Sequence, residues 1–224
     1  MVTTRFDIQV AVIGAGVMGS YHARNYLALP GAHLVAVVDP DPSARRRAEA
    51  AFGRPAYPDI ATLLRHERVQ AASLVAPTTL HYELGCELLD AGIHTLIEKP
   101  VTVEIRHALE LAARSRESDL VLQVGHITRF FRAVDLLIDQ VNEPYLIEAR
   151  RLTPHSRITD VGVILDLMIH DIDIVLRLVD APIDHMTIDG QIVRDRATNE
   201  DVAAAQIRFA NGCIARFLAS RVAP

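Results

Sequence analysis

The first half of the chain alternates short apolar runs with helical patterns, and this alternation limits its possible folds most strongly. Helical patterns cover residues 16–29, 43–52, 59–65, 80–90 and 103–117. The apolar runs are Ile8–Ile13, Leu34–Val38, Ala71–Ala76, Ile93–Glu98 and Leu120–Val124. Such runs predict strands buried on both faces, and strands joined through helices pair in parallel by right-handed crossovers. We therefore expect an α/β fold with a Rossmann-type, doubly wound parallel sheet over residues 1–125.

A different pattern begins at residue 126. Helices are expected over Arg132–Gln140 and Val163–Val179, and the strand-like runs are Tyr145–Leu152, His185–Val193, Ala203–Phe209 and Ile214–Ser220. Asn211-Gly212 joins the last two runs and predicts a hairpin with a type I′ turn. Residues 126–224 therefore read as an α+β domain with a mainly antiparallel sheet, whose last strand runs almost to the end of the chain and leaves an open edge.

Composition excludes several classes of protein. The 224 residues are 50% hydrophobic and carry a net charge of −5, which argues against disorder and against a basic surface for nucleic acid or membranes. Cys86 and Cys213 form no CxxC pair, so neither a disulfide framework nor a zinc site is expected. The apolar runs are shorter than the roughly 18–20 residues of a membrane span, and no signal peptide is apparent. We expect a soluble, cytoplasmic protein.

A glycine motif between the first strand and the first helix predicts dinucleotide binding. Gly14, Gly16 and Gly19 form GxGxxG, and the enclosed Val17 and Met18 open the helix. The glycines permit a tight turn, close approach of a pyrophosphate and close helix packing. Asp39, at the end of the second strand, would accept hydrogen bonds from the ribose and repel a 2′-phosphate, so NAD is favoured over NADP. The alternative is a glycine-rich turn in another doubly wound protein.

The only lysine of the chain stands in Glu98-Lys99-Pro100, at the end of a predicted strand. All other basic residues apart from histidine are arginine. Because the chain otherwise uses arginine for positive charge, this position is a candidate for a role that requires the compact ammonium group that only lysine provides. Ligands of parallel sheets bind outside the carboxyl ends of the strands. Lys99 can therefore hydrogen-bond a substrate hydroxyl, and Pro100 would fix the turn, with a cis peptide as one way of doing so. The alternative is a salt-bridged lysine.

A third motif, Asp166-Leu167-Met168-Ile169-His170-Asp171, lies in the long helix of the second half. Asp166 and His170 share one face of an α-helix at i, i+4 spacing. A carboxylate beside an imidazole suits a general base near neutral pH. The alternatives are a surface pair, a core histidine, or a metal site that also includes Asp173.

The other nine histidines carry no comparable partner in the sequence, although two of them follow predicted strands. His81, with Pro77 before it, is a candidate cofactor contact, and His126 is a candidate substrate contact. Each is equally well explained as a structural residue.

Together the three motifs, in this order, resemble the Gfo/Idh/MocA oxidoreductase family over the whole chain. The resemblance implies an N-terminal NAD(P)-binding domain and a C-terminal domain that holds a sugar or polyol. Carried over by position, Glu98 and Lys99 match the EKP motif, whose lysine contacts the reacting hydroxyl. Asp166 matches the substrate-positioning aspartate, and His170 matches the proposed acid/base. We expect no resident metal, because no Cys or His partner stands at ligand spacing beside these residues, and we expect a homo-oligomer.

A narrower similarity points to the branch of the family that oxidises C3 of UDP-N-acetylglucosamine to a 3-keto sugar. It rests on the segments 124–130, 148–151 and 160–173. A diphosphate substrate needs local positive charge, which arginine supplies well. The candidates are Arg129, Arg132, Arg150, Arg151 and Arg157, each of which also reads as ordinary surface charge.

The chain departs from the family in length, since members usually run about a hundred residues further. The expectation is a fragment, or a shortened form that needs a partner for its open sheet edge, with cofactor binding intact. Two other functions stay open. One is a dehydrogenase of another sugar or polyol, such as an inositol, and the other is a non-catalytic NAD-binding homologue.

Overall fold

The structure is a computed structural model that describes residues 7–154, 160–195 and 197–223. The chain divides into two compact units, Met1–Gly125 and His126–Pro224, and each is described by itself.

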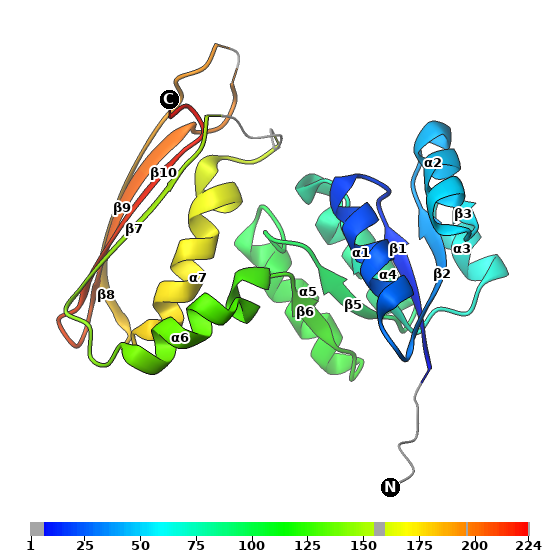
Figure 1. Ribbon diagram of the computed structural model, residues 1–224, viewed down its shortest axis with the longest axis horizontal. Helices are drawn as coiled ribbons and strands as arrows, with labels where there is room; N and C mark the ends of the chain where they lie inside the picture. Colours follow the sequence, from blue (N-terminus) through cyan, green and yellow to red (C-terminus); the bar gives the residue numbers. More distant parts are fainter. Residues whose placement is uncertain (1–6, 155–159, 196, 224) are drawn as a thin grey trace, which may run out of the picture. The chain divides into compact units, whose positions relative to one another are not determined.

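The first unit is a six-stranded parallel sheet with helices on both faces (Figure 1). The strand order is β3-β2-β1-β4-β5-β6. The strands are β1 (Ile8–Ile13), β2 (Ala32–Val38), β3 (Ala56–Tyr57), β4 (Ala71–Leu74), β5 (His94–Ile97) and β6 (Leu122–Val124). The helices are α1 (Val17–Ala28), α2 (Pro42–Phe52), α3 (Ile60–His66), the 3₁₀ turn η1 (Thr78–Leu80), α4 (His81–Asp90) and α5 (Ile105–Glu117). The predicted Rossmann architecture is confirmed, and the short edge strand β3 is an addition to the prediction.

Alternate residues of β1 explain why this strand is apolar from Val10 to Ile13. Val10 and Val12 belong to a cluster that contains Ala23 of α1 and Ala48 of α2. Ala11 and Ile13 belong to a cluster on the other face, which contains leucines of α3, α4 and α5. Both faces of the central strand are therefore covered, as expected for a parallel sheet between two helical layers.

The second unit is a mixed four-stranded sheet with a helix along one face (Figure 1). Its helical elements are the 3₁₀ turn η2 (Ile127–Phe130), α6 (Arg132–Gln140), the π-helical turn η3 (Ile164–Met168) and α7 (Ile169–Leu178). Its strands are β7 (Leu146–Leu152), β8 (Ile183–Gln191), β9 (Val202–Phe209) and β10 (Ile214–Ser220), in the order β7-β10-β9-β8. β10 pairs with β7 in parallel, and the other two pairings are antiparallel. Val163, Met168 and Val175 pack onto this sheet.

The long helix predicted over Val163–Val179 is divided. Its first turn, Ile164–Met168, is a π-helix, and regular α-helix begins only at Ile169. A π turn is wider than an α turn, and such turns often occur at functional sites. Because apolar spacing is nearly the same in both kinds of turn, the sequence pattern could not distinguish them.

The predicted type I′ turn at Asn211-Gly212 is wrong. That turn needs positive φ at both central residues, but of these two only Gly212 has it, at +89°. The loop instead has three residues, 210–212. The Gly212 amide donates to the Phe209 carbonyl at 2.9 Å, and the Phe209 amide donates to the Cys213 carbonyl at 2.9 Å. A three-residue hairpin loop needs one left-handed residue, which Gly212 supplies.

Candidate functional site

The glycine-rich loop between β1 and α1 adopts a conformation that only glycine allows at two positions. Gly14 has φ +109°, and a Cβ there would lie 2.8 Å from the Val75 carbonyl oxygen. A Cβ on Gly19 would lie 1.9 Å from the Gly14 carbonyl oxygen. Side chains at these positions would force the loop away from β4 and from the first turn of α1. Two of the three glycines are therefore required by the fold itself.

The third glycine of the motif faces open space. A Cβ on Gly16 would meet nothing within 4 Å, and Gly16 caps α1 without a side-chain hydrogen bond. Val17 and Met18, in the first turn, are exposed. The first amides of α1 therefore point to an open surface with the positive end of the helix dipole, which fits a pyrophosphate. The residues present fit NAD at this loop.

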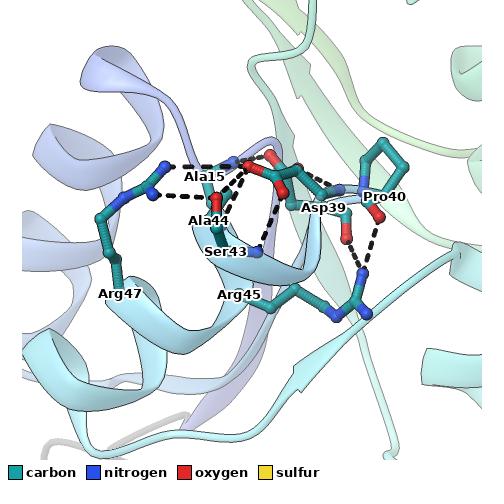
Figure 2. A network of polar contacts seen from close by, with 8 residues as sticks. Ala15, Asp39, Pro40, Ser43, Ala44, Arg45 and Arg47 are labelled. Carbon is teal, nitrogen blue, oxygen red and sulfur yellow. Dashed lines mark hydrogen bonds and ion pairs between the residues drawn. The ribbon is translucent and has the colours of Figure 1, made fainter.

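Asp39, which follows β2, is bound to the same loop (Figure 2). Its Oδ2 accepts a hydrogen bond from the Ala15 amide at 2.8 Å, and its Oδ1 accepts one from the Asp41 amide at 2.9 Å. A carboxylate has about four lone-pair positions, so each oxygen can still accept from a ribose hydroxyl. Its position beside the glycine loop is the one that the sequence spacing predicts for a ribose-binding carboxylate.

An arginine that sequence reasoning missed holds the backbone after Asp39 (Figure 2). Arg45 Nη1 donates to the Asp39 carbonyl at 2.8 Å and to the Pro40 carbonyl at 2.9 Å. The helix α2 that carries Arg45 is capped by Asp41, whose side chain accepts from the amides of Ser43 and Ala44. Hydrogen bonds from Ser43 lower the pKa of Asp41.

Three loops of this unit lie at one edge of the sheet. β1, β4 and β5 are adjacent and parallel, so the residues after them, Gly14, Pro77 and Lys99, follow neighbouring carboxyl ends. Lys99 is half-buried, and the peptide bond between Lys99 and Pro100 is cis, as the sequence suggested. Pro77 is exposed at the start of η1. The only lysine therefore lies at the sheet edge that carries the glycine loop.

His81 is buried between two of these loops and supports them. It is 1% exposed, with Nδ1 2.9 Å from the Pro100 carbonyl oxygen and Nε2 2.9 Å from the Ala76 carbonyl oxygen. Both ring nitrogens therefore face the backbone of the protein. The ring joins the loop after β4 to the turn that carries Lys99.

Glu98 also turns inward, against a histidine that sequence reasoning missed. Its Oε1 lies 3.2 Å from His22 Nε2, and its Oε2 accepts from the Lys99 amide at 3.1 Å. Burial raises the pKa of Glu98, but the hydrogen bonds and charges of His22 and Lys99 outweigh burial, so the pKa is lowered. His22 has no carboxylate partner near it in the sequence, and only the tertiary structure brings it to Glu98. Ser73, a polar residue in a buried strand, was the available signal.

In the second unit, Asp166 lies in the π turn and His170 lies in the first turn of α7. Asp166 is 5% exposed, and His170 is half-buried. Arg221, missed by sequence reasoning, is 1% exposed, with Nη2 4.0 Å from Asp166 Oδ2 and 2.8 Å from the Val161 carbonyl oxygen. Arg221 thus places a positive charge beside the buried Asp166 carboxylate, which offsets part of the cost of burying that charge.

Two arginines considered for a diphosphate are paired with carboxylates of α7. Arg129 Nε donates to both oxygens of Asp173, at 2.9 and 2.7 Å. Arg151 Nη2 donates to Asp171 at 2.6 Å. Arg157 lies outside the described residues. Arg132 begins α6, and Arg150 lines a shallow pocket on the second sheet.

His126 lies close to one of these carboxylates, with Nδ1 3.9 Å from Asp173 Oδ2. Asp173 is thus held by Arg129 and approached by His126. Within the described part of the chain, no three His, Cys, Asp or Glu side chains gather in a group that could hold a metal ion. No helix of that part is long and apolar enough to cross a membrane.

Comparison with known proteins gives the same two-part division. Residues 8–126 match the model described as "Oxidoreductase family, NAD-binding Rossmann fold", and residues 140–224 match the model of the GFO/IDH/MocA C-terminal domain. The UDP-N-acetylglucosamine 3-dehydrogenase of Acidithiobacillus ferrooxidans is 37% identical over 218 residues, which cover 96% of this chain and 67% of that protein. The solved structure of that enzyme, at 34% identity, superposes with a TM-score of 0.87 over 96% of this chain and 70% of its own.

Among more distant relatives is the scyllo-inositol 2-dehydrogenase (NAD(+)) of Bacillus subtilis. It is 27% identical over 97% of this chain and 68% of its own length. The chain thus spans about two thirds of the length of these relatives. With family models matched in both halves and a relative at 37% identity, the chain belongs to the Gfo/Idh/MocA family of oxidoreductases and carries its NAD-binding Rossmann domain.

Proposed function

We propose that the protein is an NAD-dependent dehydrogenase that oxidises a secondary hydroxyl of a sugar, at C3 of UDP-N-acetylglucosamine. The observation that carries the proposal is the position of Lys99 at the sheet edge of the glycine loop. A cofactor bound at that loop extends along the carboxyl ends of the strands, where a lysine can meet the reacting hydroxyl. The choice of nucleotide sugar is supported by the similarity to the Acidithiobacillus enzyme.

The proposed cofactor contacts divide into direct and supporting residues. Gly14, Gly16, Gly19 and the amides of Val17 and Met18 form the phosphate cradle, and Asp39 accepts from the ribose. Pro77 lines the loop after β4. Because Glu98 and His81 face the interior, we assign them a supporting role for the turn at Lys99.

Oxidation of an alcohol requires that a hydride leave the carbon while a proton leaves the oxygen. NAD supplies the hydride acceptor when it is bound. In the proposed mechanism the Lys99 ammonium donates a hydrogen bond to the hydroxyl oxygen and stabilises the negative charge that develops there. His170 accepts the hydroxyl proton, and Asp166, beside Arg221, accepts a substrate hydrogen bond.

Recognition of the diphosphate is tested separately from the chemistry, because the arginines proposed for it already have carboxylate partners. Arg129 and Arg151 would have to share their charge between a phosphate and their carboxylate partners. His126, beside Asp173, is a further proposed substrate contact. Comparing UDP-N-acetylglucosamine with free N-acetylglucosamine isolates the contribution of the nucleotide.

A second candidate, a polyol dehydrogenase, is favoured by the similarity to the inositol enzyme. The test is a panel of UDP-N-acetylglucosamine, free N-acetylglucosamine, myo-inositol and scyllo-inositol, followed by NADH absorbance. We expect turnover of the nucleotide sugar and inhibition by UDP. Turnover of an inositol alone would support the second candidate. Binding of NAD without turnover of any compound would point to a non-catalytic homologue.

A further inference from the structure

Next to the turn that carries Lys99, four polar side chains form a connected hydrogen-bond network inside the first unit. His22 Nδ1 lies 3.0 Å from Ser73 Oγ, and the hydroxyl of Tyr26 lies 2.7 Å from the same Oγ. His22 Nε2 lies 3.2 Å from Glu98 Oε1. Only 14% of the His22 side chain and 10% of the Glu98 side chain are exposed. Ser73 is fully buried in β4.

The available donors and acceptors limit which atom donates in each of these hydrogen bonds. An ionised Glu98 only accepts, so His22 Nε2 donates to it, and when the ring is neutral its Nδ1 accepts from the Ser73 hydroxyl. The Tyr26 hydroxyl completes the chain by donating to Ser73 Oγ. Every polar group has a partner in this arrangement, and a fully satisfied buried network fixes its members strongly.

The Glu98 carboxylate is also enclosed by the backbone of Lys99 and by the backbone of Gly125. Its Oε2 accepts the Lys99 amide at 3.1 Å. A Cβ on Gly125, which follows β6, would lie 2.9 Å from Oε1, so the carboxylate fills the space that a side chain would need. The carboxylate is therefore held between α1, β6 and the backbone of Lys99, with little freedom to rotate.

We propose that His22 is a positioning residue that acts through Glu98 to hold the backbone of Lys99 in place relative to the cofactor loop. His22 stands on α1, the helix whose first turn forms the phosphate cradle, so the network joins the cradle to the turn of Lys99. The consequence for catalysis depends on the proposed function, because Lys99 matters only if it meets the substrate. The effect on the Lys99 backbone does not depend on it.

The single lysine makes a direct test possible. Labelling with [¹⁵N]lysine gives one backbone amide signal, from Lys99, and its hydrogen-exchange rate reports the bond to Glu98 without cofactor or substrate. We expect His22→Ala to speed exchange of this amide at least tenfold and to shift its resonance. His22→Gln, which can still donate one hydrogen bond to Glu98, should restore most of the protection. If His22→Ala does not fold, Glu98→Gln applies the same test, because it removes the charge that binds His22 and weakens the bond to Lys99.

His33→Ala is the matched control. His33 Nε2 also lies 3.2 Å from a carboxylate, Asp7 Oδ1, but this pair is more than half exposed, at the start of β2. Its loss should leave the Lys99 signal unchanged. An unchanged Lys99 exchange rate in both His22→Ala and Glu98→Gln would overturn the proposal.

Kinetics separate this proposal from the proposed function. With a substrate found for the parent, His22→Ala should lower kcat about tenfold to a hundredfold, with KM and NAD affinity within about threefold, as expected for a displaced catalytic group. Loss of Lys99 protection without any parent turnover would refute only the proposed function. Loss of protection with unchanged kcat would overturn the catalytic part of this inference.

Discussion

Asp39 serves the fold and, in our account, the cofactor. Replacing it with alanine removes two acceptors for backbone amides, each worth about 1 kcal/mol, and the charge that would repel a 2′-phosphate. We expect Asp39→Ala to weaken NAD binding about tenfold and to reduce the preference for NAD over NADP. Titration of both cofactors by calorimetry measures this. Unchanged preference would contradict the assignment, and Asp39→Asn, which keeps an acceptor, separates loss of charge from loss of hydrogen bonds.

Glu98 gives a prediction for stability in acid. Its pKa is lowered in the folded protein, so the native state favours the ionised form more than the unfolded chain does. This contribution is fully present above the unfolded pKa, near ~4.3, and is lost as the pH falls through the folded pKa. Urea unfolding at a series of pH values should show a shallower decline below about pH 5 in Glu98→Gln than in the parent. If the free energy of unfolding falls equally in both proteins as the pH is lowered, Glu98 does not contribute to the loss of stability in acid.

The loop between β1 and α1 contains glycines that the fold requires and one, Gly16, that we expect only cofactor binding to require. Gly16→Ala meets no atom of the protein within 4 Å, whereas Gly19→Ala would meet the Gly14 carbonyl oxygen. We expect Gly16→Ala to change the free energy of unfolding by less than about 1 kcal/mol while weakening NAD binding at least tenfold. Gly19→Ala should lose stability directly. Wild-type NAD affinity in Gly16→Ala would mean that the pyrophosphate does not approach here.

The π turn that carries Asp166 depends on a contact between Gly162 and Glu200. A Cβ on Gly162 would lie 1.9 Å from Glu200 Oε1, and that oxygen accepts from the Ile164 amide at 3.1 Å. Gly162→Ala should displace the Glu200 carboxylate and cost about 1 kcal/mol of stability, through loss of its hydrogen bond from the Ile164 amide. In the double variant with Glu200→Ala, Gly162→Ala should cost less, since the clashing carboxylate is gone. Denaturant unfolding of the four proteins tests this coupling, and strictly additive effects would contradict it.

Local sequence patterns predicted the architecture of the first unit and the position of the glycine loop. Alternating runs identified the parallel sheet, and glycine spacing identified the cradle. The missed residues act over long separations: His22 lies 51 residues from Ser73 and 76 from Glu98. No local periodicity encodes such pairings. The π turn was missed for another reason, because its apolar spacing mimics an α-helix.

The charged pairs of the second unit also join residues far apart in the sequence, so local patterns could not predict them. Arg129 and Asp173 are 44 residues apart, so the sequence could suggest a free arginine for phosphate but not its carboxylate partner. Arg221, buried beside Asp166, stands 55 positions after it in the chain, and nothing near Arg221 in the sequence indicates burial. The types of candidate residue could be predicted, whereas their partners required the tertiary structure.

In the proposed mechanism Lys99 and His170 serve the same oxidation. The most direct measurement is a double-mutant cycle of Lys99→Met and His170→Gln, with kcat on the accepted substrate and NAD affinity measured for all four proteins. We predict that each single change lowers kcat by about 10² to 10⁴, that the double change costs little more than the worse single one, and that NAD affinity stays within about threefold. Turnover like the parent in both single variants would contradict the account.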